Sequence, residues 1–275
     1  MTTVLKCRFF NDIPPVVPLT FNDNPAPLPQ CIFHPIIDSE IADALAQMSN
    51  QSAPGKSGHG YKLIKWTWEA TPEWITTLFN SCLLTGYHPK LWKAAIIAVV
   101  PKQGRTDYSL PKNYCPIALL ECLGKLLEKV IAKRVHHDIG ALSLVPTNQF
   151  GARPHSSTIH AGLTLTHDIA LTHTCRGCCS SIQFDIQGFF DNINHGRLIH
   201  CFRLLGFAEE ICKWLTSFLA DRSVQLRLNG ATSDPINILV GAPQGSPISP
   251  ILSVIYTSLL RLQGAVWLIS IRVGF

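Results

Sequence analysis

Apolar residues recur at helical spacing over several stretches of the chain. The clearest pattern places Leu123, Leu126 and Val130 on one face of a segment, and it predicts a helix from Ala118 to Asp138. Similar patterns predict helices over residues 158–173, 197–205 and 209–220. Much of the chain is therefore expected to be helical.

Two further helices are indicated by residues that cap helix ends. Asp38 or Ser39 can cap a helix that runs to Met48. Thr71 stands at an N-cap position with Pro72 directly after it, and a glycine at 86 follows the last turn. Between these two helices, residues 52–60 have the composition of a flexible loop.

Short apolar runs and alternating patterns predict strands. Residues 94–100 form an apolar run that Pro101 ends. Residues 224–229 alternate and reach an Asn-Gly pair, which predicts a hairpin turn toward residues 236–240. A further apolar strand runs into Asp185. Because helices and strands are mixed without βαβ regularity, the expected class is α+β.

The chain of 275 residues, 47% of them hydrophobic, is large enough to bury a core. Seven prolines between Ile13 and Pro35 predict a linker. The net charge of +5 fits a polyanionic partner such as nucleic acid, without proving one.

The ten cysteines do not indicate a secreted protein, because the first residues lack a hydrophobic signal core. We expect reduced thiols and an intracellular location, with no distinction between nucleus and cytoplasm. The apolar stretch from Ile248 to Ile271 is interrupted by Pro250, Arg261 and Gln263, so we expect a buried helix and a tail rather than a membrane anchor.

Two segments carry candidate chemistry. Asp185 ends its strand and precedes Gly188 and two phenylalanines, so its carboxylate could hold a hard cation such as Mg²⁺. Residues 241–250 form a Gly/Pro-rich turn before an apolar helix, in which Gly245 permits close backbone approach and Gln244 offers donors and acceptors. The alternative is that Asp185 merely ends a strand and Asp191 caps a helix.

In this order and at this spacing, the two segments resemble motifs A and B of reverse transcriptases, in particular those of non-LTR (LINE-like) retrotransposons. The resemblance implies a right-hand polymerase fold and RNA-directed DNA synthesis by nucleotidyl transfer. It also implies an RNA template, a DNA primer and deoxynucleoside triphosphates as partners. Asp185 would be a catalytic residue and a ligand of a two-metal Mg²⁺ site.

The resemblance implies roles for further residues. Phe190, five residues after Asp185, would be the steric gate that excludes a 2′-hydroxyl group, although a core position is the alternative. Gln244 and Gly245 would contact a templating or incoming nucleotide. Residues 92–102 and 113–120 are similar to the fingers segment, in which Lys102 would contact the triphosphate; the alternative is a solvated lysine.

Two more segments extend the resemblance. Residues 149–154 are similar to the next family block, where Arg153 would lie near phosphate; the alternative is an arginine that pairs with a helix end. Residues 54–58 resemble the N-terminal extension of these enzymes, and their Gly-Lys-Ser lacks the spacing of a P-loop. Cys115 stands where the family carries an arginine, and a thiol cannot provide the bidentate grip of a guanidinium on phosphate.

The resemblance runs from about residue 51 to 260. We expect a linker and N-terminal extension over 1–50, fingers over 51–175, a partial palm with motifs A and B over 176–260, and an unrelated tail over 261–275. The family places an aromatic-x-Asp-Asp motif C after motif B, whereas residues 261–275 contain no carboxylate. We therefore expect a truncated polymerase without a thumb, inactive alone, in which residues 265–273 can serve as a substitute strand beside motif A.

Two alternatives remain open. The chain could be a non-catalytic nucleic-acid-binding remnant. The other alternative is a small zinc-organised interaction module, suggested by the Cys-x-x-Cys spacing of Cys175 and Cys178 beside His173. A structural zinc site normally needs a second ligand pair, and none is evident in the sequence.

Overall fold

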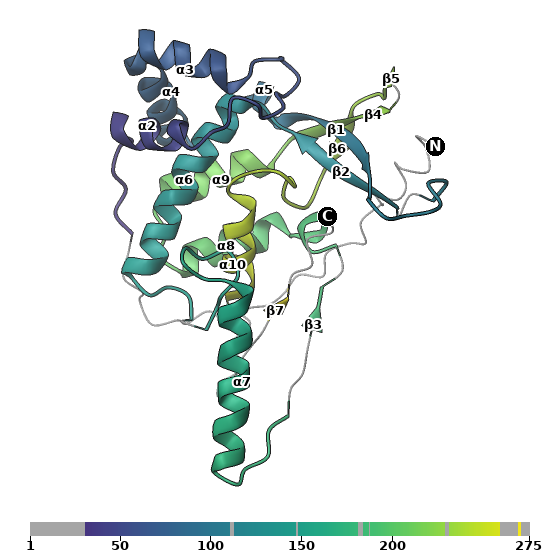
Figure 1. Ribbon diagram of the computed structural model, residues 1–275. Coiled ribbons are helices and arrows are strands. Elements are labelled where there is room, and N and C mark those ends of the chain that lie inside the picture. The colour runs from purple at the N-terminus through teal and green to yellow at the C-terminus, as the bar shows by residue number, and fades with distance from the viewer. Residues whose placement is uncertain are drawn as a thin grey trace.

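The computed structural model describes residues 31–110, 113–146, 148–180, 184–186, 188–228, 231–258 and 269–270, without the side chains of residues 115, 184, 185, 269 and 270. Most of the expected proline-rich linker and of the 1–50 segment lies outside these residues, as does the greater part of the 261–275 tail. Figure 1 shows helices gathered at one side of the molecule and a sheet at the other.

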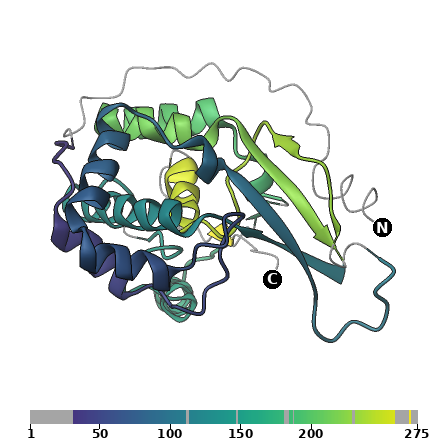
Figure 2. The ribbon, with the colours of Figure 1, turned by 90° about the horizontal axis from the view of Figure 1, so that it is seen from above.

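The helical part consists of α2 (Asp38–Ala46), α3 (Tyr61–Ala70), α4 (Pro72–Leu84), α6 (Cys122–Ala141), α8 (His195–Leu204), α9 (Glu209–Leu219) and α10 (Ser249–Ser258). Seen from above, α10 lies between the other helices (Figure 2). Ile251, Leu252 and Ile255 of α10 are at most 1% exposed. The apolar helix that follows the 241–250 turn is therefore at the centre of the main core.

The sheet mixes parallel and antiparallel pairing. Strand β1 (Ala94–Pro101) follows the short helix α5 (Lys90–Lys93) and pairs antiparallel with β2 (Tyr114–Leu119). On its other edge β1 runs parallel to β4 (Arg222–Leu228), which pairs antiparallel with both β5 (Ala231–Thr232) and β6 (Ile236–Ile238). A separate small apolar cluster packs along this sheet; it comprises Ala95, Ile97, Ala118, Leu120, Val224 and Leu226.

Helix α7 (Thr158–Thr174) projects from the body of the molecule (Figure 1). Its first turn is capped by Ser157, whose hydroxyl oxygen accepts a hydrogen bond from the His160 amide at 3.3 Å. None of its residues is buried. The chain returns from α7 toward β3 (Phe184–Asp185), which pairs in parallel with β7 (Ile269–Ser270).

These elements agree with the expected mixture of helices and strands. Strand β7 falls within the segment expected to act as a substitute strand beside motif A, and it does pair with β3. Within the described residues, no helix is both long and apolar enough to cross a membrane.

Two local expectations were wrong, and one helix was missed. The helix expected from Ala118 begins only at Cys122, because residues 114–119 pair with β1 as β2. Helix α3 was not predicted. The N-cap of α2 is Ile37 rather than Asp38 or Ser39, and its amide is held by the Glu40 carboxylate at 3.0 Å.

Candidate functional site

The 241–250 turn is attached directly to the segment that follows β3. The Gly241 amide donates to the Ile193 carbonyl at 2.9 Å, and the Ala242 amide donates to the Phe190 carbonyl at 2.7 Å. Gly241 has a φ of +87°, and a Cβ there would lie 2.7 Å from the Phe190 oxygen. Only glycine fits such an approach, so this turn and the 188–194 segment are held together by their backbones.

Side chains join the same two segments. The Gln244 side-chain amide donates to an oxygen of Asp191 at 3.1 Å. Burial raises the pKa of Asp191, and the hydrogen bond from Gln244 opposes that rise. His195 Nε2 lies 2.8 Å from the Gly241 carbonyl, and because a carbonyl can only accept, Nε2 carries the proton. Burial lowers the pKa of His195, which keeps this imidazole neutral near pH 7.

The opposite side of the turn contacts a strand and a helix. Gly245 has a φ of +101°, and a Cβ there would lie 3.0 Å from the carbonyl oxygen of Ala118 in β2. The Ser246 hydroxyl donates to the Glu128 carboxylate on α6. The Ser249 hydroxyl donates to the Pro243 carbonyl at 2.9 Å, where α10 begins. The turn therefore sits at the junction of β2, α6, α10 and the residues after β3.

Phe190 lies in the short 3₁₀ helix η2 (Phe190–Asn192) and is buried in the main core. Its ring meets that of Phe189 edge to face at 5.5 Å, and Phe189 meets Tyr256 of α10 at 5.8 Å. The ring therefore occupies the core position that the sequence left open as an alternative. The backbone oxygen of Phe190 is the atom that contacts the 241–250 turn.

Asp185 is the last residue of β3, where its backbone pairs with Ser270. Among the described residues, no group of three or more His, Cys, Asp or Glu side chains could hold a metal ion.

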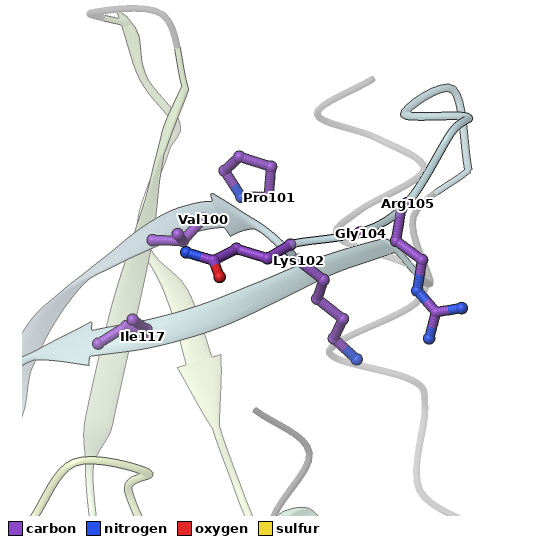
Figure 3. Close-up of a pocket in the computed structure, with 7 residues that line it drawn as sticks. Val100, Pro101, Lys102, Gly104, Arg105 and Ile117 are labelled. Atoms are coloured by element: carbon purple, nitrogen blue, oxygen red, sulfur yellow. The ribbon is translucent and has the colours of Figure 1, made fainter.

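Two basic side chains among the described residues of the β1–β2 loop lie at one place. Lys102 and Arg105 extend from it toward the same side (Figure 3). They help to line a hollow of about 510 Å³ together with Val100, Pro101, Gln103, Gly104 and Ile117. The Lys102 backbone is fixed, because its amide donates to the Asn113 carbonyl at 2.8 Å and its carbonyl accepts from the Tyr108 hydroxyl at 2.9 Å. The Lys102 side chain is half-buried at this place.

Arg153 lies in the loop before α7. Its guanidinium donates to the Pro146 carbonyl at 3.2 Å, so it bridges two parts of that loop. Among the site residues expected from the sequence, the fold brings Phe190, Gln244 and Gly245 together. Lys102 and Arg153 belong to two other elements, the β1–β2 loop and the loop before α7.

The loop containing Lys56-Ser57-Gly58 binds a carboxylate of its own chain. The Ser57 amide and hydroxyl donate to the two oxygens of Glu121, at 2.8 and 2.5 Å. A Cβ on Gly55 would lie 2.7 Å from the Glu121 amide nitrogen. The donors that a P-loop would offer to phosphate are therefore engaged by Glu121, in line with the rejection of a P-loop.

Sequence reasoning missed two residues at the turn. Asp191 was considered only as a helix cap, and its partner Gln244 lies on a distant segment. Glu128 interrupts the apolar face formed by Leu127, Val130 and Ile131, which was the available signal. The zinc-module alternative gains no support, because Cys175, Cys178 and Cys179 are exposed and belong to no metal-binding group among the described residues.

The chain is similar in sequence to known proteins. The family described as reverse transcriptase (RNA-dependent DNA polymerase) matches residues 100–262. The probable RNA-directed DNA polymerase from transposon BS of Drosophila melanogaster is 30% identical over 231 residues, which cover 84% of this chain and 25% of that protein. The RNA-directed DNA polymerase from mobile element jockey of the same species is 28% identical over 219 residues, which cover 80% of this chain and 24% of that protein.

A third relative comes from a beetle. The retrovirus-related Pol polyprotein from type-1 retrotransposable element R2 of Popillia japonica is 29% identical over 221 residues, which cover 80% of this chain and 29% of that protein. The chain thus spans about a quarter of the length of these relatives. Because the family match covers more than half of the chain, the chain belongs to the reverse transcriptase (RNA-dependent DNA polymerase) family, with relatives among non-LTR, LINE-like retrotransposons.

Proposed function

We propose that this chain is the fingers and part of the palm of an RNA-directed DNA polymerase from a LINE-like retrotransposon. Its substrates would be an RNA template, a DNA primer and deoxynucleoside triphosphates. The observation that carries the proposal is the backbone attachment of Gly241 and Ala242 to the residues after β3. This attachment unites the two segments that resemble motifs A and B, which are far apart in sequence.

Each expected site residue has a proposed role. Asp185 would be a catalytic metal ligand, and Mg²⁺ would supply charge stabilisation to the transferring phosphate. Gln244 and Gly245 would line the nucleotide site beside Asp191. Phe190 would act as the steric gate, a role that requires its ring edge to face the nucleotide from within the core. Lys102 and Arg153 would contact phosphate groups.

We also propose that the 275-residue chain by itself binds a primer–template without extending the primer. Residues 51–175 would form the fingers and residues 176–260 the partial palm. A two-metal site needs more than one carboxylate, and residues 261–275 contain no Asp or Glu. In this form the chain would act as a nucleic-acid-binding unit, which is the second candidate function.

Fluorescence anisotropy with a labelled RNA–DNA primer–template tests the binding. We expect affinity that falls steeply as salt rises, because lysine and arginine contacts release counterions from phosphate. Lys102→Ala and Arg153→Ala should each weaken binding and reduce the salt slope by about 1.

Lys213→Ala is the matched control, because Lys213 is exposed on α9, away from the β1–β2 loop. It should leave binding nearly unchanged. Absence of binding at low salt, or affinity that does not depend on salt, would overturn the proposal.

A further inference from the structure

A carboxylate is buried directly behind the 241–250 turn. Glu128 projects from α6 and is 1% exposed, and it accepts a hydrogen bond from the Ser246 hydroxyl, itself 4% exposed. The Ser246 oxygen in turn accepts from the Ile248 amide at 3.3 Å. A chain of hydrogen bonds therefore runs from the α6 helix into the backbone of the turn.

A buried cation completes the surroundings of Glu128. Arg222 is 4% exposed, and its positive charge acts on the Glu128 carboxylate. The guanidinium is held in place by the Phe218 carbonyl at 2.9 Å and lies 4.8 Å from the Phe218 ring. Burial raises the pKa of the Glu128 carboxyl, and the hydrogen bond from Ser246, with the positive charge of Arg222, opposes that rise.

Arg222 also belongs to the strand pair that leads into the turn. It is the first residue of β4 and pairs in register with Ile238, the last residue of β6. The chain passes from Ile238 into Gly241 within three residues. Of these two buried residues, Glu128 contacts the turn directly, through Ser246.

We propose that Glu128 is a positioning residue for the 241–250 turn, and that it sets the place of Gln244 beside Asp191. The inference rests on the proposed function for its meaning, because Gln244 matters for polymerisation only if the turn lines a nucleotide site. The contacts themselves do not depend on that function. Neither oxygen of Glu128 needs to touch a substrate for this role.

Hydrogen exchange of the full chain measures the effect at the turn. In Glu128→Ala the Ile248 amide loses its ordered acceptor, because the Ser246 hydroxyl is no longer fixed. We expect exchange at Ile248 and Ala242 to become faster by about tenfold, from the usual net strength of a hydrogen bond. Ser246→Ala should give the same local effect, since it removes the other half of the same contact.

Three comparisons separate positioning from a general loss of stability. Val135→Ala, on the same helix and also buried, removes apolar packing away from the turn and should change exchange at Ile248 only as far as it changes global unfolding. Glu128→Gln keeps an oxygen that can accept from Ser246 and should retain most of the protection. The double variant Glu128→Ala/Ser246→Ala should add little to either single change.

The proposal is overturned if Glu128→Ala and Val135→Ala accelerate exchange at the turn equally at matched global stability, or if the two single changes are additive. A second experiment, which measures nucleotide binding, is independent of these results. If the wild-type chain binds an RNA–DNA hybrid, dCTP added opposite a template guanine should tighten the complex, and Glu128→Ala should reduce that effect. Failure of the wild-type chain to bind the hybrid would overturn the proposed function. The hydrogen-exchange result on the position of the turn would still hold.

Discussion

The carbonyl oxygen of Phe190 lies against Gly241 so closely that a Cβ at residue 241 would be 2.7 Å from it. The same oxygen accepts the Ala242 amide at 2.7 Å. One backbone atom thus requires a glycine on the neighbouring segment and also binds that segment. The spatial relation between the two sequence motifs depends on this contact.

Gly241→Ala should therefore destabilise the chain. The added methyl group meets a backbone oxygen, and the residue must keep a φ of +87° that side chains rarely adopt. We expect a loss of about 1–3 kcal/mol in the free energy of unfolding, measured by urea denaturation. Gly162→Ala on exposed α7 is the control, because a Cβ there meets nothing within 4 Å, and it should be neutral or slightly stabilising.

The 275-residue chain should not extend a primer on an RNA template in the presence of Mg²⁺. In the proposed site Asp185 is the one metal-binding carboxylate, and a single carboxylate cannot coordinate two cations in the required geometry. A gel-based extension assay with labelled primer tests this. Robust extension that Asp185→Ala abolishes would show that carboxylates elsewhere complete the site.

The stability of the chain should fall as pH falls below 6.5, in part because of His88. This side chain is fully buried between Trp92, Trp214 and Phe218. Burial, with the nearby charges of Arg222 and Lys93, lowers the pKa of His88 from 6.5 to about 3. The unfolded chain therefore binds a proton at this imidazole that the folded chain does not, between those two pH values.

The expected contribution is about 1.4 kcal/mol of stability lost for each pH unit between 6.5 and 3. His88→Phe keeps an aromatic ring between Trp92, Trp214 and Phe218. It should reduce the pH dependence of the urea unfolding midpoint over that range. A change at exposed His160 is the control. Equal pH dependence in wild type and His88→Phe would contradict the assignment.

The isolated chain should bind a hydrophobic dye and associate with itself. Ile159 is 70% exposed and Leu163 is 62% exposed, and both lie on α7, in which no residue is buried. Exposed apolar surface of this kind promotes association. The double change Ile159→Lys/Leu163→Lys should reduce dye binding and light scattering without lowering the unfolding temperature. The expectation would be refuted by a wild-type chain that is monomeric, unfolds in one cooperative transition and binds no dye.

Several features could be predicted from the sequence because they depend on neighbours along the chain. The start of α4 at Pro72 and the strand β1 ending at Pro101 follow from proline's fixed φ and missing N–H. The helix α10 follows from an apolar run after a proline-containing turn. The family resemblance also rests on local order and spacing, and the match over residues 100–262 supports it.

Other features were decided only by tertiary structure. Residues 118 and 119 have helical spacing in the sequence, but pairing with β1 makes them part of β2, since a strand that completes a sheet gains hydrogen bonds that local preference cannot offer. The joining of Phe190 to Ala242 and of Glu128 to Ser246 brings together residues far apart along the chain. Such contacts arise when separate elements pack on one core, so the sequence determined the family and many elements, and the folded chain determined which side chains meet at the site.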